Sequence, residues 1–162
     1  MSQGQPRFIT ASGFAKLRAE YDELFGSERP KLVETIAWAA ANGDRSENGD
    51  YIYGRKKLRE IDRELAHLSR RMKSAKVVDP ARQADRSRVF FGATVTILDE
   101  DNVQRTLTLV GEDEADAGAG RISWRSPLAN ALKGAAVGDC RRVELPGGVR
   151  EQEVIAIRYP DR

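Results

Sequence analysis

A short glycine-rich stretch, AAANGDRSENGDY, gathers three acidic residues: Asp44, Glu47 and Asp50. Carboxylates three positions apart on one turn can point the same way and share a divalent cation through oxygen ligands, which Mg²⁺ prefers. Two carboxylates cannot hold Mg²⁺ tightly alone, because this ion keeps several waters and needs further ligands. If Asp44 and Glu47 do chemistry, another macromolecule must therefore supply the rest of the site.

The same acids also fit an ordinary helix start. Asp44 followed by Glu47 matches a capping box, in which the second acid reaches back to the N–H of the cap, and acids near a helix N-terminus are favoured by the dipole. Ser46 could cap the helix instead, which would leave Asp44 free. Gly49 does not support a helix, since it costs about 1 kcal/mol relative to Ala. Capping and chemistry both remain open on these residues alone.

A first helix is predicted before this stretch. Its apolar positions follow 3-4-3 spacing at Phe14, Leu17, Tyr21 and Leu24. Thr10 can cap its start. Pro30 lacks an N–H and clashes with the preceding turn, which predicts a kink or a short break. The helix is expected to end near Asn42 and Gly43, two residues that tolerate the left-handed conformation typical of helix ends.

A second helix is predicted after the stretch. Its apolar positions alternate spacings of three and four and form a heptad seam of Tyr51, Gly54, Leu58, Ile61, Leu65, Leu68, Met72 and Ala75. Because the connection is short, the two helices should run antiparallel and side by side. We therefore predict a helical hairpin over residues 1–79 with arms of roughly 40 Å. The acidic stretch, residues 42–50, would form its tip.

The second helix is strongly basic. Residues 55–76 carry nine Lys or Arg against three acids, a net charge of +6. At 100° per residue, Lys56, Arg59, Arg63 and Arg70 fall on the side opposite the seam. Contact with a polyanion and a solvated face held by i,i+4 ion pairs are both compatible with this pattern.

Three aromatic residues lie beside the predicted tip. Trp38 is expected to pack onto the second helix around Tyr51 or Tyr53, with contact to a partner as the alternative. Tyr51 falls on the seam, which favours a core position, and either tyrosine could stack on a nucleic-acid base.

The remainder of the chain changes its period. Residues 80–88 are polar, include Pro80, and are predicted to be a linker. The segments VFFGATVTILDE, VQRTLTLVGE, RISWRS, CRRVELPG and REQEVIAIRY are β-rich, with one short helix, PLANALKG, between strands. We predict an antiparallel α+β domain over residues 89–162, where nine basic and twelve acidic residues give a net charge of −3.

Cysteine and histidine content excludes some functions. One cysteine and one histidine allow neither an internal disulfide nor a cysteine- or histidine-rich metal cluster. No apolar signal segment opens the chain, and no run approaches the roughly 20 apolar residues of a membrane span. We expect a soluble, cytoplasmic protein with no membrane partner.

Two blocks resemble the bacterial transcript cleavage factors of the GreA/GreB family. WAAANGDRSENGDYIYGRKKLREIDREL, residues 38–65, is closer to the GreB branch through WAA, GDRSEN and KKLREIDRE. ISWRSPLANALKGAAVGD, residues 122–139, is similar to the family's C-terminal domain, and FFGATVTI also fits. The resemblance spans essentially the whole chain in the right order. One departure is Gly49, where the family has Ala.

The resemblance implies an N-terminal antiparallel coiled-coil hairpin and a C-terminal FKBP-like domain that docks at the rim of the RNA polymerase secondary channel. Asp44 and Glu47 match the family's two acids. They would hold a Mg²⁺ ion jointly with the polymerase, with none bound stably by the chain alone, in a two-metal site. The reaction would be hydrolysis near the 3′ end of backtracked nascent RNA. Ser46 and Asn48 would orient the acids or the water, and the chain would have no stand-alone enzymatic activity.

Further contacts follow from the same resemblance. The residues expected to bind RNA or polymerase are Arg45, Arg55, Lys56, Lys57, Arg59 and Arg63. The residues expected to contribute to docking are Ser126, Pro127 and Leu128. The expected partners are RNA polymerase and the 3′ end of nascent RNA, and the factor itself is expected to be a monomer.

Three other functions remain as alternatives. A non-cleaving regulator of the secondary channel would share this architecture, but the intact Asp44 and Glu47 pair favours cleavage. A prolyl isomerase is suggested only by the FKBP-like fold, and fold does not fix function. A coiled-coil dimer is disfavoured by the helix-breaking NGD sequence between the two helical patterns.

Overall fold

The computed structural model of the protein describes residues 7–42 and 48–161. The chain divides into two compact units, one formed by Phe14–Ser74 and the other by the chain up to Gly13 together with Ala75–Arg162. The predicted first domain extended to residue 79. Residues 75–79 instead group with the C-terminal unit, because β1 (Arg7–Ile9) and β2 (Ala75–Val77) pair there as a parallel two-stranded sheet.

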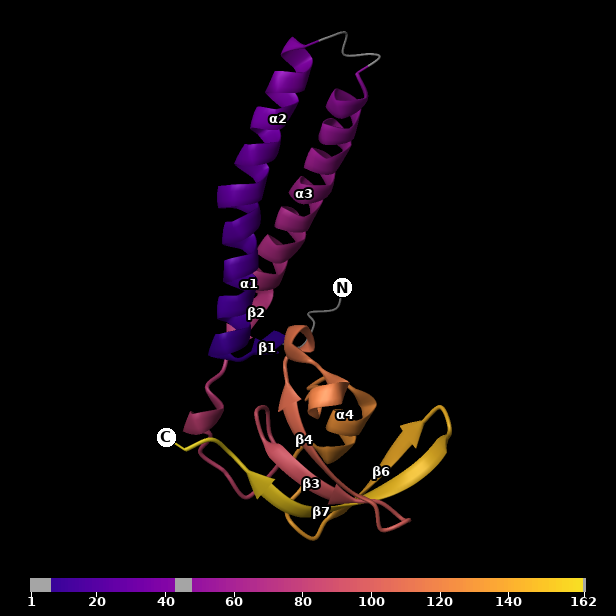
Figure 1. Cartoon of the computed structure of the whole chain (residues 1–162). Helices are drawn as coiled ribbons and strands as arrows, with labels where there is room; N and C mark the ends of the chain where they lie inside the picture. Colours follow the sequence, from indigo (N-terminus) through magenta and orange to yellow (C-terminus); the bar gives the residue numbers. More distant parts are fainter. Residues whose placement is uncertain (1–6, 43–47, 162) are drawn as a thin grey trace, which may run out of the picture. The chain divides into compact units, whose positions relative to one another are not determined.

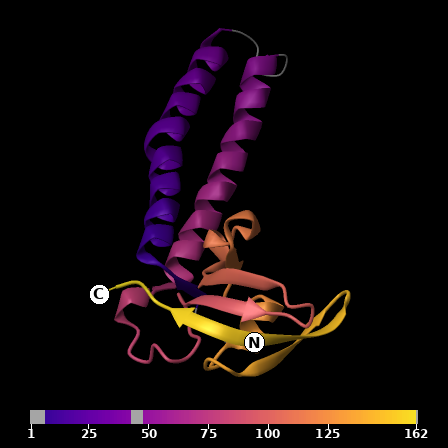
Figure 2. The ribbon, with the colours of Figure 1, turned by 60° about the horizontal axis from the view of Figure 1, so that its bottom comes forward.

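The helical unit is the predicted antiparallel hairpin. It contains α1 (Ala11–Glu23), a π-helical segment (Leu24–Glu28), α2 (Arg29–Ala41) and α3 (Gly49–Ser74). Figures 1 and 2 both show α2 and α3 side by side. Asn48, just before α3, contacts Ala39 near the end of α2. Asp62, in the middle of α3, contacts Arg29 at the start of α2. The two helices therefore run in opposite directions.

The predicted heptad seam of α3 faces α2. Gly54, Ile61, Leu65 and Leu68 are buried, and the remaining helical seam positions, Tyr51, Leu58 and Met72, are half-buried. Ile36 and Ala39 are the buried residues of α2. Ala75, the last predicted seam position, belongs to β2 instead, because α3 ends at Ser74.

The irregularity predicted at Pro30 takes the form of a π-helical segment rather than a break. Pro30 has no N–H to donate to the carbonyl four residues earlier, so regular α-helical bonding must fail just before it. The N–H of Arg29 bonds to Leu24 O, five residues back, and α2 then continues. At the start of α1, Thr10 caps the helix as predicted, since its Oγ1 accepts from Gly13 N at 3.1 Å.

The C-terminal unit is built on a five-stranded sheet with strand order β5-β4-β3-β7-β6. Its strands are β3 (Thr94–Leu98), β4 (Gln104–Val110), β5 (Arg121–Ser123), β6 (Cys140–Leu145) and β7 (Gly148–Arg158). The pairs β3–β4, β3–β7 and β6–β7 are antiparallel, as predicted. The pair β4–β5 is parallel, because the chain between them crosses over through two short 3₁₀ helices, Glu112–Glu114 and Ala117–Ala119.

One helix, α4 (Pro127–Leu132), lies where PLANALKG predicted it. Its Ala129 and Leu132 join Val95, Leu109 and Val154 in the fully buried core. The predicted linker contains a short 3₁₀ helix, Pro80–Arg82, capped by the side chain of Asp79. The α+β fold class predicted from the sequence is confirmed.

Candidate functional site

Asn48 joins the end of α2 to the start of α3. Its Nδ2 donates to Ala39 O at 2.6 Å, and its Oδ1 accepts from Tyr51 N at 3.1 Å. The second contact is that of an N-cap, in which a side-chain oxygen accepts from the N–H three residues later. The backbone carbonyl of Asn48 also accepts from Ile52 N at 3.0 Å, as the first α-helical bond.

The end of α2 is closed by Asn42. Its N–H donates to Ala39 O at 3.2 Å and its Nδ2 donates to Trp38 O at 2.9 Å. Asn42 has φ −100° and ψ 12°, so it ends the helix without the left-handed conformation expected from the sequence. Ala39 O therefore accepts from both Asn42 and Asn48, and this single carbonyl links the two helix ends.

The residues predicted to do chemistry lie between these two ends. Gly43, Asp44, Arg45, Ser46 and Glu47 are outside the residues that the structure describes, so their predicted roles stay predictions. The structure does show which residue caps α3. A capping box of Asp44 and Glu47 requires a helix that begins at residue 45, whereas α3 begins at Gly49 and Asn48 is its cap.

The helices α2 and α3 pack closely at Gly54, six residues after Asn48. A Cβ added to Gly54 would lie 2.7 Å from Ile36 Cγ1, so only glycine permits this approach without a shift of the neighbour. Further along, Arg29 Nε donates to Asp62 Oδ1 at 2.8 Å. This hydrogen bond and the negative charge of Asp62 raise the pKa of Arg29.

Five basic residues in the first half of α3, all predicted to contact RNA or polymerase, are exposed. Within the described part of the chain, no ion pair involves any of the five predicted contact residues Arg55, Lys56, Lys57, Arg59 and Arg63. Glu60 follows Lys56 by four residues without pairing to it, and Asp62 pairs across the hairpin with Arg29. These five residues therefore do not form the i,i+4 ion pairs that would be expected if this helix face were only solvated.

Apolar side chains are exposed beside the joined helix ends. Trp38 is 65 %, Tyr53 63 % and Ile52 53 % exposed. The expectation that Trp38 packs against the second helix is wrong, because Trp38 lies about 200° around α2 from the buried Ile36. Tyr51 is half-buried, in agreement with its seam position.

The three predicted docking residues surround the start of α4. Ser126 Oγ accepts from Ala129 N at 3.2 Å and caps the helix. Leu128 is half-buried against the core. Pro127 is exposed at the first turn, so it is the one of the three whose side chain is presented to solvent. Their docking role stays a prediction.

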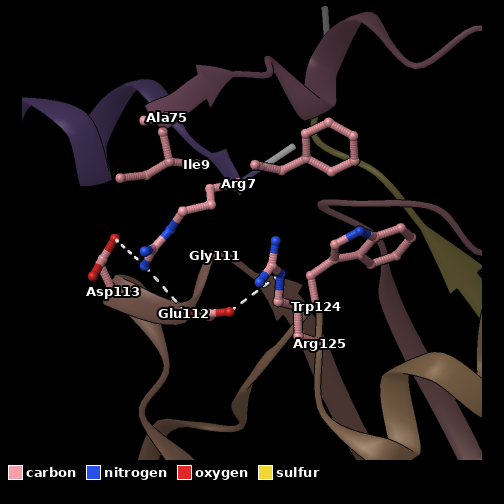
Figure 3. Close-up of a pocket in the computed structure, with 9 residues that line it drawn as sticks. Arg7, Ile9, Ala75, Gly111, Glu112, Asp113, Trp124 and Arg125 are labelled. Atoms are coloured by element: carbon pink, nitrogen blue, oxygen red, sulfur yellow. Dashed lines mark hydrogen bonds and ion pairs between the residues drawn. The ribbon is translucent and has the colours of Figure 1, made fainter. Parts of the chain in front are cut away.

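A small charged pocket lies in the C-terminal unit, shown in Figure 3. Arg7 reaches Glu112 at 3.1 Å and Asp113 at 3.9 Å, and Arg125 reaches Glu112 at 3.2 Å. The cavity of about 10 Å³ has room for about one water molecule. The charged side chains that line it neutralise one another, so this pocket ties β1 to the loop after β4 and is not a substrate site.

A larger groove in the same unit was not anticipated from the sequence. Its volume is about 580 Å³, and its aromatic lining is Phe8, Phe90, Phe91 and Trp124. Three of these rings pack together, with centroids 5.5 to 6.2 Å apart. Sequence reasoning found no aromatic pocket because these rings come from three distant segments. The pairing of β1 with β2, together with the contacts of Arg7 with Glu112 and Asp113, brings Phe8 to the others.

Two absences hold for residues 7–42 and 48–161. No cluster of three or more His, Cys, Asp or Glu side chains is arranged to bind a metal ion. No helix has the length and hydrophobicity needed to span a membrane.

The fold therefore consists of two units. In the helical unit, Asp44 and Glu47 lie in the sequence between the end of α2 and the cap of α3, and α3 carries exposed basic residues. The family model described as "Transcription elongation factor, N-terminal" matches residues 7–77, and the model "Transcription elongation factor, GreA/GreB, C-term" matches residues 83–159.

Curated relatives agree over nearly the whole chain. Transcription elongation factor GreB of Neisseria meningitidis serogroup B is 44 % identical over 98 % of both chains. GreB of Pseudomonas aeruginosa is 47 % identical over 94 % of this chain and 90 % of its own. GreA of Alkalilimnicola ehrlichii is 40 % identical over 93 % and 96 %. The chain belongs to the GreA/GreB family of transcription elongation factors, which confirms the resemblance stated from the sequence.

Proposed function

We propose that this elongation factor binds RNA polymerase through its secondary channel and stimulates hydrolytic cleavage of the 3′ end of backtracked nascent RNA. The observation that carries the proposal is the position of Asn48. Asn48 caps α3 and bonds to Ala39 O, so a residue other than Asp44 and Glu47 supplies the cap of α3 and a link between the two helix ends. Membership of the GreA/GreB family supports the same role.

In this proposal the hairpin carries the two acids to the active centre of the polymerase. The seam, the close approach at Gly54 and the Arg29–Asp62 pair hold α2 and α3 in one register. A register fixed in this way limits how far the ends of the two helices can move relative to each other. The C-terminal unit would dock at the rim of the channel, where Pro127 is available for contact.

Asp44 and Glu47 would hold Mg²⁺ jointly with groups of the polymerase. Their oxygens suit this ion, but two carboxylates are too few to bind it tightly. A Mg²⁺ ion bound there supplies Lewis-acid stabilisation of the negative charge that develops on phosphodiester oxygens. The chain contributes the two carboxylates and their placement. It is therefore an accessory factor with no activity of its own on RNA.

The five exposed cations between Arg55 and Arg63 would bind the phosphates of the extruded RNA. Exposed Lys and Arg side chains without acidic partners lose no existing ion pair when they bind a phosphate, and their affinity for RNA falls as salt rises. Arg55, Lys56 and Lys57 lie within about three turns of Asn48, so they are the cations of α3 nearest to the acids along the chain.

The experiment uses RNA polymerase stalled in a backtracked state. With Mg²⁺ and the native factor, we expect short fragments released from the RNA 3′ end. Asp44→Ala and Glu47→Ala should each lower the cleavage rate about a hundredfold, the scale for loss of one group that stabilises transition-state charge. Polymerase binding should persist in both variants.

Asp50→Ala is the matched control, since Asp50 is an acid of the same stretch in the first turn of α3. It should retain cleavage. If both acid variants cleave at the native rate, the carboxylates are not part of the catalytic site. If even the native factor binds polymerase without stimulating cleavage, the non-cleaving regulator is the correct alternative.

A further inference from the structure

Tyr53 is an exposed aromatic residue of the hairpin, away from its buried seam. It is 63 % exposed and lies in the first turns of α3, outside the seam that faces α2. Single exposed aromatics need no explanation. Here Trp38 and Ile52, both more than half exposed, flank the same joined helix ends. Exposed apolar surface is therefore concentrated at the functional end of the hairpin.

The neighbours of Tyr53 on the helix surface are cationic. Lys56 and Lys57 lie three and four residues further along α3, and residues at these spacings occupy the same face. Both ammonium groups are exposed, and neither has an ion-pair partner among the described residues. The Cα atoms of the two lysines lie about 4.5 to 6 Å further along the helix axis than the Cα atom of Tyr53.

An aromatic face beside unpaired cations has the chemistry that binds single-stranded nucleic acid. Bases stack on the ring whatever their sequence, while the cations take the phosphates. A purely apolar protein surface would leave both lysines to be desolvated without a partner, which is costly. The observations therefore favour a nucleotide over an apolar protein segment at this position.

We propose that Tyr53 is the stacking platform for an unpaired base of the extruded RNA, with Lys56 and Lys57 binding the adjacent phosphates. The inference rests on the proposed function, since it names the RNA contact made beside the same site. Tyr53 would be a positioning residue. It would hold the RNA strand in register with the acids and take no part in bond cleavage.

The first test is a double-mutant cycle between the protein and the RNA. Backtracked complexes are prepared with an abasic nucleotide at each extruded position in turn, and cleavage is measured with subsaturating factor. Tyr53→Leu should reduce cleavage roughly tenfold on RNA with all its bases, in line with the loss of one base–aromatic stack. On RNA that lacks the contacted base, Tyr53→Leu should cause no further loss, and Tyr53→Phe should behave as native throughout.

Phe25→Leu provides the control, because Phe25 is 57 % exposed on the same hairpin but lies in the π-helical segment, far along the chain from the acids. It should change cleavage on neither RNA. An equal loss for Tyr53→Leu on both RNAs would assign Tyr53 to a polymerase contact and overturn the proposal. Native behaviour of Tyr53→Leu on both RNAs would overturn it as well.

The second test does not depend on cleavage. 2-Aminopurine is placed at the contacted position of the extruded RNA in complexes without Mg²⁺, and its fluorescence is followed as factor is added. The native factor and Asp44→Ala should both quench it, and Tyr53→Leu should not. Quenching without acid-dependent cleavage would leave the stacking proposal standing while the proposed function fails. Identical quenching by Tyr53→Leu would refute stacking, whatever the acids do.

Discussion

At the scale of single residues, Asn48 decides how the hairpin end is closed. One side chain both caps α3 and bonds to the last buried turn of α2. Asn48→Ala removes both contacts and should lower the free energy of unfolding of the hairpin by about 1–2 kcal/mol, the usual range for loss of a cap. Urea unfolding followed by helical circular dichroism measures this change.

Asn48→Ser separates the two contacts. Serine can still cap the helix, but its side chain is too short to reach Ala39 O, so this variant should lose roughly half as much stability as alanine. A hairpin equally stable in all three forms would show that Asn48 does not hold the helix ends.

At the scale of elements, two glycines of α3 differ in a way that only the packing reveals. Gly54 faces Ile36 at a distance that excludes a Cβ, whereas a Cβ on Gly49 would meet no atom of the described residues within 4 Å. Gly54→Ala should therefore destabilise the hairpin by about 1–3 kcal/mol through overpacking. Gly49→Ala should be neutral or stabilise it by up to about 1 kcal/mol through helix propensity.

The paired measurement is the urea midpoint of each variant at an unchanged slope. Both changes add one methyl group to the same helix, so propensity alone predicts stabilisation by both. The same sign of change in the two variants would contradict the close approach of α2 and α3 at Gly54.

At the scale of the whole molecule, Tyr159 links the segment that follows β7 to residues 88–90, which precede β3. Its hydroxyl donates to Arg88 O at 2.6 Å and accepts from Phe90 N at 2.9 Å. Burial raises the pKa of Tyr159 above the ordinary value of 10.0. The neutral phenol is the form that can donate, so the folded state holds this proton more firmly than the unfolded chain does.

A raised pKa in the folded state contributes stability that is present below pH 10 and is lost as the pH rises through the folded pKa. The unfolding free energy of the C-terminal unit should therefore fall above about pH 10. Tyr159→Phe should be less stable at neutral pH and should lack the part of the alkaline decline that is due to this group. Denaturant unfolding at several pH values tests this, and an identical decline in the variant would contradict it.

The sequence by itself determined the elements whose signals are periodic and repeated. The seam of α3 follows from apolar spacing over seven helical positions, and the strands of the main sheet follow from β-rich segments between turns. The family motif around Asp44 and Glu47 is equally local. Each of these patterns lies within one continuous segment, so no distant contact is needed to recognise it.

Tertiary structure decided everything that depends on residues brought together from separate segments. The three-residue strands β1 and β2 are too short to carry a pattern, and they exist only as a pair. The aromatic groove at Phe8 depends on that pairing. The capping of α3 by Asn48 and its bond to Ala39 O are seen only in the structure. Hydrogen bonds and close packing depend on distances in space that spacing along the chain does not encode.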